Sequence, residues 1–171
     1  RKSGRRHRTK AQLFGSGSIM NEVLKAQEIL EDYGVAADVW SVTSYKELHR
    51  DALQVERYNR LNPDAEPQTA YVADALKDAK GVFVAASDYI KILPDALARH
   101  LPRPMVSLGT DGFGRSEARA ELRDFFEVDA RHVVLATLTA LAEDGKVDKA
   151  TLLEAREDLQ IDPDKANPYV D

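Results

Sequence analysis

The chain has 171 residues, of which 43% are hydrophobic and 31% charged, so wholesale disorder is excluded and one domain with a buried core is expected. Its formal net charge of −5 is unevenly spread, because the first ten residues carry six basic side chains and no acidic one, which leaves −11 on the rest. Nucleic-acid binding needs an excess of Lys and Arg, so it is excluded for the acidic part.

The absence of cysteine excludes disulfides and thiolate metal sites. The longest apolar run, residues 82–86, is far shorter than the ~20 residues of a membrane span.

The first quarter of the chain predicts a strand, a helix and a second strand. Residues 11–14 form a short strand that ends at a Gly-Ser-Gly-Ser sequence. A helix follows, because apolar side chains recur every three or four positions from Ile19 to Tyr33, and Gly34 is a typical helix stop. Residues 37–42 predict the second strand.

The middle of the chain continues this alternation. Thr43 or Ser44 is expected to cap a helix over residues 46–61, and a shorter helix is expected over residues 71–79. The unbroken apolar run at 82–86 then predicts a strand that is buried on both faces of a sheet.

The last half of the chain is predominantly helical. Ser87 and Asp88 are expected to cap a helix over residues 89–100, and residues 105–108 predict a fourth strand. Three capped helices complete the chain, over residues 117–126 after Ser116, 130–144 after Asp129, and 148–160 beginning at Asp148. Strands that alternate with helices in this way predict an α/β fold with a mainly parallel sheet and helices on both faces.

Two glycine-rich loops follow predicted strands, where α/β proteins often bind ligands. In the first, Gly15-Ser16-Gly17, the third glycine of a dinucleotide motif is replaced by Met20, and no Gly-Lys-Ser/Thr follows. A tight turn is therefore favoured over a phosphate cradle, with simple anion binding at the helix start as the open alternative.

The second loop, residues 109–116, contributes the candidate site residues Asp111, Phe113, Arg115 and Ser116. Arg115 and Ser116 at a helix start would suit an anion. The favoured interpretation is structural, with a turn at Asp111, Phe113 as a docking aromatic and Ser116 as a helix cap. On this interpretation Phe113 and Arg115 anchor the loop on a neighbouring domain.

No residue is assigned a catalytic, cofactor-binding or metal-binding role. The four histidines are never three or four positions apart, so the helical spacing of metal ligands is absent. His132, next to two valines in a predicted helix, is interpreted as a structural residue.

Several ordered blocks resemble a known family. They are residues 13–19 (Leu-Phe-Gly-Ser-Gly-Ser-Ile), 38–48 (Asp-Val-Trp-Ser-Val-Thr-Ser-Tyr-Lys-Glu-Leu), 86–91 (Ala-Ser-Asp-Tyr-Ile-Lys) and 108–116 (Leu-Gly-Thr-Asp-Gly-Phe-Gly-Arg-Ser). Together they resemble the C-terminal domain of the homodimeric-type pyruvate dehydrogenase component. The resemblance implies a transketolase C-terminal-like fold, with helices on both faces of a mostly parallel five-stranded sheet that includes one antiparallel strand.

The resemblance also implies the reaction of a parent enzyme. That oxidoreductase of central carbon metabolism decarboxylates pyruvate on thiamine diphosphate and reductively acetylates the lipoyl group of the dihydrolipoyl acetyltransferase component. The family's cofactor signature, Gly-Asp-Gly followed by Asn, is absent, because Thr110 interrupts it and no Asn lies between Asn62 and Asn167. Thiamine diphosphate and magnesium are therefore expected outside this segment, which is expected to be inactive alone.

The resemblance also implies that the segment is part of a homodimeric enzyme in the bacterial cytoplasm. Residues 1–10 are expected to be a basic linker from a preceding thiamine-binding domain, and residues 11–171 the domain itself. The domain would support dimer assembly and domain packing, with no nucleic-acid or membrane partner. The alternative is a stand-alone doubly wound domain that binds a phosphate-bearing small molecule.

Overall fold

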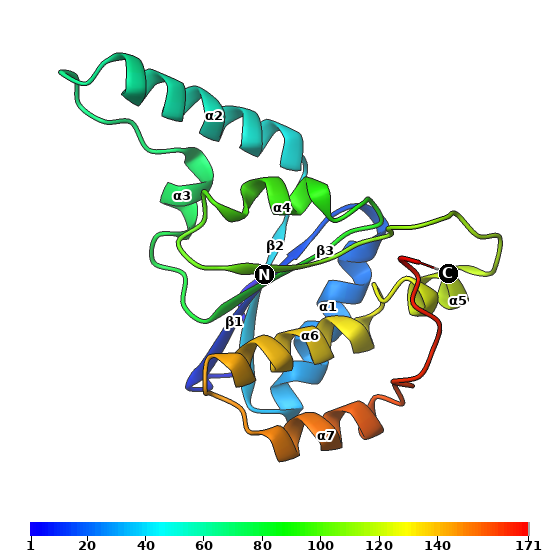
Figure 1. Ribbon diagram of the computed structural model, residues 1–171. Coiled ribbons are helices and arrows are strands. Elements are labelled where there is room, and N and C mark those ends of the chain that lie inside the picture. The colour runs from blue at the N-terminus through cyan, green and yellow to red at the C-terminus, as the bar shows by residue number, and fades with distance from the viewer. Residues whose placement is uncertain (171) are drawn as a thin grey trace.

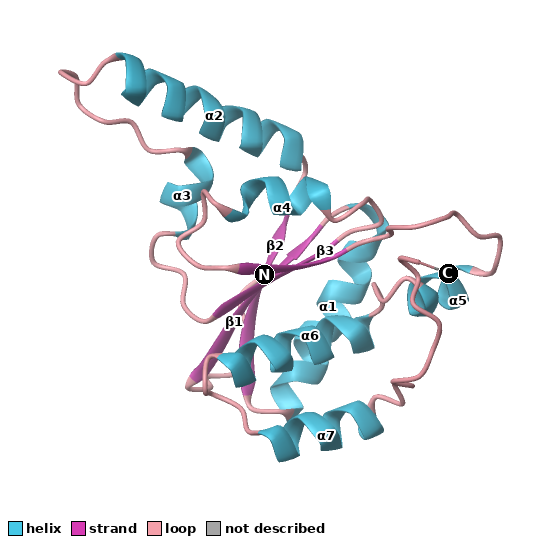
Figure 2. Ribbon diagram, viewed as in Figure 1, coloured by secondary structure: helices cyan, strands magenta, loops and turns pink. Residues whose placement is uncertain are grey.

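The computed structural model describes residues 1–170 and is built around one parallel sheet (Figure 2). The sheet contains β1 (Thr9–Gly15), β2 (Val35–Ser41), β3 (Val82–Ala86) and β4 (Met105–Leu108). The strands lie in the order β2-β1-β3-β4, and each neighbouring pair is parallel. The predicted α/β architecture is thus confirmed, with the first strand central and later strands added on either side.

The expected five-stranded sheet with an antiparallel strand is wrong for residues 1–170, where the sheet has four parallel strands. One antiparallel pair of residues lies at the outer edge of β2 within residues 1–170, where Arg1 and Val39 exchange both backbone hydrogen bonds at 2.7 Å. The strand pairing ends there because the next backbone N–H groups donate to side-chain carboxylates. The N–H of Ser3 donates to Asp38, and the N–H of Gly4 donates to Glu31.

Ion pairs hold the basic start of the chain against the acidic body. Arg1 pairs with Glu28 at 2.9 Å, Lys2 with Asp38 at 2.9 Å and Arg5 with Glu31 at 3.4 Å. All three basic side chains remain more than half exposed, so each pair contributes little to stability on its own. The segment nevertheless follows the surface of the domain from Arg1 to the start of β1.

Helices cover both faces of the sheet (Figure 1). One layer contains α1 (Met20–Asp32), α6 (Ala130–Glu143) and α7 (Lys149–Asp158), and the other contains α2 (Tyr45–Leu61), α3 (Tyr71–Leu76) and α4 (Ile92–Ala98). A short 3₁₀ helix, η1 (Gly17–Ile19), precedes α1, and α5 (Arg119–Phe125) follows β4. Within residues 1–170, no helix is both long enough and apolar enough to cross a membrane.

β3 shows how the sheet joins two hydrophobic cores. Val84 and Ala86 face the core beneath α1 and α6, whereas Phe83 and Ala85 face the core beneath α2 and α4. All four residues are at most 1% exposed. Because successive side chains of a strand point to opposite faces, an unbroken apolar run fills both cores at once. The prediction from residues 82–86 is confirmed.

The helical stripe and three caps are also confirmed. In α1 and the turn before it, Ile19, Val23, Ala26 and Leu30 are at most 1% exposed, and Gly34 ends the helix region with a φ of +71°. Three N-cap side chains accept hydrogen bonds from backbone N–H groups three residues on: Ser44 from Glu47, Asp129 from His132, and Asp148 from Thr151.

Two predicted helix starts are wrong. α4 begins at Ile92 rather than residue 89, and its N-cap is Lys91. Pro94 explains the later start, because proline has no N–H and fits only the first helical turn. Ser87, one of the predicted caps, instead accepts a hydrogen bond from the N–H of Tyr89 in the turn after β3.

α5 likewise begins later than predicted. Its first residue is Arg119, and its N-cap is Ala118, which has no side-chain acceptor. Ser116, the predicted cap, lies exposed in the preceding loop. The pattern of a serine before an apparent helix was therefore misleading at this position.

Glu22 is a buried carboxylate that joins three helices. It lies in α1 and is 5% exposed. Its oxygens accept hydrogen bonds from the Arg123 guanidinium of α5 at 2.8 Å and from the N–H of Ala130, the first residue of α6, at 3.2 Å. Lys25 adds a third contact at 3.0 Å. A buried charge is tolerated only when it is paired in this way.

We expect Glu22→Ala to lower the free energy of unfolding by about 3 kcal/mol, because the Arg123 guanidinium, 15% exposed, would lose its ionic partner. Lys25→Ala is the matched control, since it removes only the exposed partner of the same carboxylate, and it should cost less than about 1 kcal/mol. Chemical denaturation measures both. Equal midpoints for the two variants would contradict a buried junction at Glu22.

Candidate functional site

The loop from β4 to α5, residues 109–118, is fixed to the turn after β3. The N–H of Thr110 donates to the Tyr89 carbonyl at 3.0 Å, and its hydroxyl donates to the Asp88 carbonyl at 2.7 Å. Gly109 lies so close to this turn that a Cβ there would be 2.5 Å from the Tyr89 carbonyl oxygen. The two loops at the carboxyl end of the sheet therefore form one structure.

Asp111 reinforces this connection. Its side chain is 17% exposed, lies 3.7 Å from the ammonium of Lys91, and accepts a hydrogen bond from the Lys91 N–H at 3.4 Å. The carboxylate thus serves to hold the turn after β3. The sequence interpretation placed Asp111 in a turn of its own loop, and in the structure its side chain holds the neighbouring turn after β3.

Gly112 allows the C-terminal segment to approach the loop. Its φ is +92°, and a Cβ at this position would lie 2.1 Å from the carbonyl oxygen of Pro168. The Lys91 ammonium is 5.7 Å from the ring centre of Tyr169. Figure 1 shows the loop and the C-terminal segment on the same side of the domain, near α5.

The remaining predicted site residues are exposed. Phe113 is 84% exposed, and Ser116 lies on the surface without capping α5. The guanidinium of Arg115 stacks over the Phe125 ring, with its central carbon 4.3 Å from the ring centre. The structure thus places Asp111, Phe113, Arg115 and Ser116 in one loop, but each makes different contacts.

Phe113 belongs to a surface that three neighbouring segments form. We call it the loop surface and define it as residues 89–92, 110–113 and 168–170, which the contacts above hold together. It contains six large apolar side chains that are each at least half exposed: Tyr89, Ile90, Ile92, Phe113, Tyr169 and Val170. A contiguous apolar patch marks an interaction site, and exposed apolar side chains on three segments that contact one another are candidates for such a patch. Sequence reasoning found Phe113 but missed the contributions from the other two segments.

The first glycine-rich turn is packed against other parts of the protein. A Cβ at Gly15 would lie 2.9 Å from the Met20 sulfur, and the buried Ser16 hydroxyl donates to the Ser87 hydroxyl at 3.0 Å. Gly17 has a φ of +53°. These contacts support the interpretation of residues 15–17 as a tight turn rather than a phosphate cradle.

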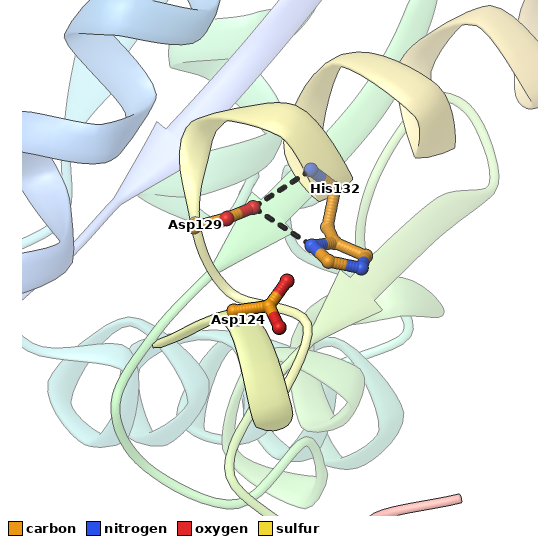
Figure 3. A group of neighbouring side chains, drawn as sticks. All are labelled: Asp124, Asp129 and His132. Atoms are coloured by element: carbon orange, nitrogen blue, oxygen red, sulfur yellow. Dashed lines mark hydrogen bonds and ion pairs between the residues drawn. The ribbon is translucent and has the colours of Figure 1, made fainter. Parts of the chain in front are cut away.

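One group of side chains has the composition of a metal site but is already neutralised. Asp124, Asp129 and His132 lie together at the start of α6 (Figure 3). Asp129 accepts hydrogen bonds from both the backbone N–H of His132 at 3.0 Å and the ring Nδ1 at 2.7 Å. Arg131 pairs with both aspartates, and the Lys165 ammonium is 3.9 Å from Asp124.

The carboxylates of Asp124 and Asp129 are therefore already paired with Arg131 and Lys165. Asp129 is better described as a structural acid. Burial opposes its ionisation, but hydrogen bonds from His132 and Arg131 outweigh burial and lower its pKa to about 2. In the sequence, an aspartate at a helix start predicted the N-cap at Asp129. It did not predict the contact between Asp129 and the ring of His132, three residues later.

The lowered pKa of Asp129 predicts a pH dependence of stability. Because the folded pKa is below the ordinary value of 3.8, its stabilisation is present above pH 4 and is lost as the pH falls toward 2. Asp129→Asn keeps a good cap but removes the charge, so we expect a loss of about 1 kcal/mol at pH 7 that shrinks below pH 4.

Denaturant unfolding between pH 2 and pH 7 measures this effect. Asp148→Asn is the control, because Asp148 caps α7 without a histidine partner, and its effect should be smaller. A difference between Asp129→Asn and the wild type that does not change from pH 7 to pH 2 would contradict the assigned role.

Comparison with known proteins agrees with the resemblance in the sequence. The family model described as Transketolase-like TK C-terminal domain matches residues 2–129. The pyruvate dehydrogenase E1 component of Pseudomonas aeruginosa is 47% identical over 159 residues, which are 92% of this chain and 18% of that protein. The Escherichia coli K12 protein of that name is 47% identical over 161 residues, 93% of this chain and 18% of its own length.

A more distant relative, the pyruvate dehydrogenase E1 component of Mycolicibacterium smegmatis, is 42% identical over 153 residues, 89% of this chain and 16% of that protein. The chain thus spans less than one fifth of the length of these relatives. The matched segment is their C-terminal part. From the family match and these identities, the chain belongs to the transketolase-like C-terminal domain family.

Proposed function

We propose that the chain acts as the C-terminal domain of a bacterial pyruvate dehydrogenase E1 component. The observation that carries this proposal is the identity of 40–47% with proteins of that name over about nine tenths of the chain. In this proposal the full enzyme decarboxylates pyruvate on thiamine diphosphate and reductively acetylates the lipoyl group of the dihydrolipoyl acetyltransferase. It works as a homodimer in the cytoplasm.

The domain itself is non-catalytic in this proposal. Gly109-Thr110-Asp111-Gly112, the segment nearest to a cofactor signature, is engaged in contacts with residues 89–91 and Pro168. The acidic group at Asp124 and Asp129 is neutralised by Arg131 and Lys165. These contacts support the binding of thiamine diphosphate and magnesium in the preceding domains rather than here.

The role of the domain is to pack on the preceding domains of the same chain, and thereby to support dimer assembly. The loop surface is the face that would be buried, because its six apolar side chains are too exposed for a face that remains in water. Residues 1–10 provide the connection, and the ion pairs of Arg1, Lys2 and Arg5 with α1 and β2 hold its first half against the domain.

The absence of catalysis in this segment is tested with the 171-residue chain. Supplied with pyruvate, thiamine diphosphate and magnesium, it should release no carbon dioxide above the uncatalysed rate, whereas full-length E1 should turn over under the same conditions. Turnover by the segment alone would contradict the proposal.

The docking role is tested in full-length E1. We expect Phe113→Ala combined with Arg115→Ala to weaken dimerisation at least about tenfold and to lower the melting temperature, because burial of one Phe side chain stabilises by roughly 1.5–3 kcal/mol. Analytical ultracentrifugation and calorimetry measure the two effects.

Leu61→Ala is the matched control for the docking test. Leu61 ends α2 and is 56% exposed, but it is not part of the loop surface. If the double variant behaves as Leu61→Ala does, then the loop surface remains in solvent in the full enzyme and the docking role is wrong.

A further inference from the structure

A cavity of about 290 Å³ lies between the start of α1, the loop after β4, and α5. Its position at the carboxyl end of a parallel sheet is the usual ligand position in α/β proteins. Its apolar lining consists of Ile19, Leu122, Phe126 and Val128, and its basic lining of Arg115, Arg119 and Arg123. An apolar lining with a few convergent charged groups is typical of small-molecule sites.

The sequence of α5 places this lining on one helical face. Arg119 and Arg123 are one turn apart, and Leu122 and Phe126 fall on the same side. No residue of α5 is fully buried, although this face is turned toward the domain. The face therefore borders the cavity instead of packing tightly against the sheet.

The arginines of the lining differ in whether the protein itself pairs with their positive charge. Arg123 is held by Glu22 and also donates to the carbonyl and hydroxyl of Ser18, at 3.2 Å each, so it forms a fixed wall. The side chain of Arg119, by contrast, makes no hydrogen bond or ion pair with any of residues 1–170. Among residues 1–170, Asp88 is the one carboxylate in the lining, and it already accepts a hydrogen bond from Ser18.

We propose that this cavity binds a small anion that carries a phosphate or carboxylate group attached to an apolar group. Arg119 contacts the anionic group through charge-assisted hydrogen bonds. Ile19, Leu122 and Phe126 contact the apolar group. The proposal does not depend on the identity of the parent enzyme, and it places anion binding beside the Gly15–Gly17 turn rather than in it.

The test uses phenyl phosphate and benzoate as probes, because they carry the two anionic groups on the same ring. Isothermal titration calorimetry with the 171-residue chain should detect saturable binding of at least one of them, and phenol, the uncharged analogue, should not bind. Which anion binds more tightly distinguishes a phosphate site from a carboxylate site. Affinity should fall as salt is added.

Arg119→Glu should weaken the binding at least about tenfold, the size of the loss of one charge-assisted hydrogen bond. Arg119 is exposed, so the variant should fold, as checked by circular dichroism. Arg57→Glu, the same charge reversal on exposed α2, is the matched control and should leave affinity unchanged. The proposal is overturned if neither anion binds with a Kd below about 10 mM, which is the weak end of affinity for a specific site. It is also overturned if Arg119→Glu and Arg57→Glu bind the anion with the same Kd.

Discussion

The structure at the carboxyl end of the sheet depends on the hydrogen bonds and ion pairs of the buried Glu22 carboxylate. This carboxylate fixes Arg123 of α5 and the first N–H of α6 against α1. Through Arg123 it also fixes the turn at Ser18, and through α6 the acidic cap at Asp129. A buried ion pair of this kind adds little net stability over an apolar contact, but it tolerates only one geometry. It therefore determines where α5 lies, and with it the wall of the arginine-lined cavity.

The parts of the fold that the sequence predicted are those that local chemistry determines. β3 and β4 were predicted with their observed bounds, because each is a short, largely apolar segment next to Gly or Pro. The caps at Ser44, Asp129 and Asp148 satisfy backbone groups within one helical turn. The start of α4 was missed although Pro94 restricts it locally, and the turn before α4 is held by Thr110 and Asp111, far away in the sequence. The start of α5 was missed because Ser116 has the residue type of a cap but does not serve as one.

The same distinction applies to the candidate site. The loop at 109–116 could be found from its glycines, since Gly109 and Gly112 are needed where other backbone approaches closely. The loop surface could not be assembled from sequence, because its three segments are brought together only by the fold. Arg119 was also missed, since an exposed arginine in a helix is indistinguishable from solvated charge until the cavity beside it is known. A residue that borders a cavity, as Arg119 does, has no distinctive sequence pattern.

The antiparallel pair between Arg1 and Val39 has a consequence for self-association. An uncovered sheet edge invites pairing with another chain, and proteins guard such edges by short strands, charges or covering segments. Here β2 is guarded by Arg1 and by Lys2 paired with Asp38, while the opposite edge, β4, is only four residues long. Neither edge offers a long row of free backbone groups for cross-chain strand addition. In the proposed assembly, contacts of this domain with other chains would therefore use side-chain surfaces rather than strand pairing.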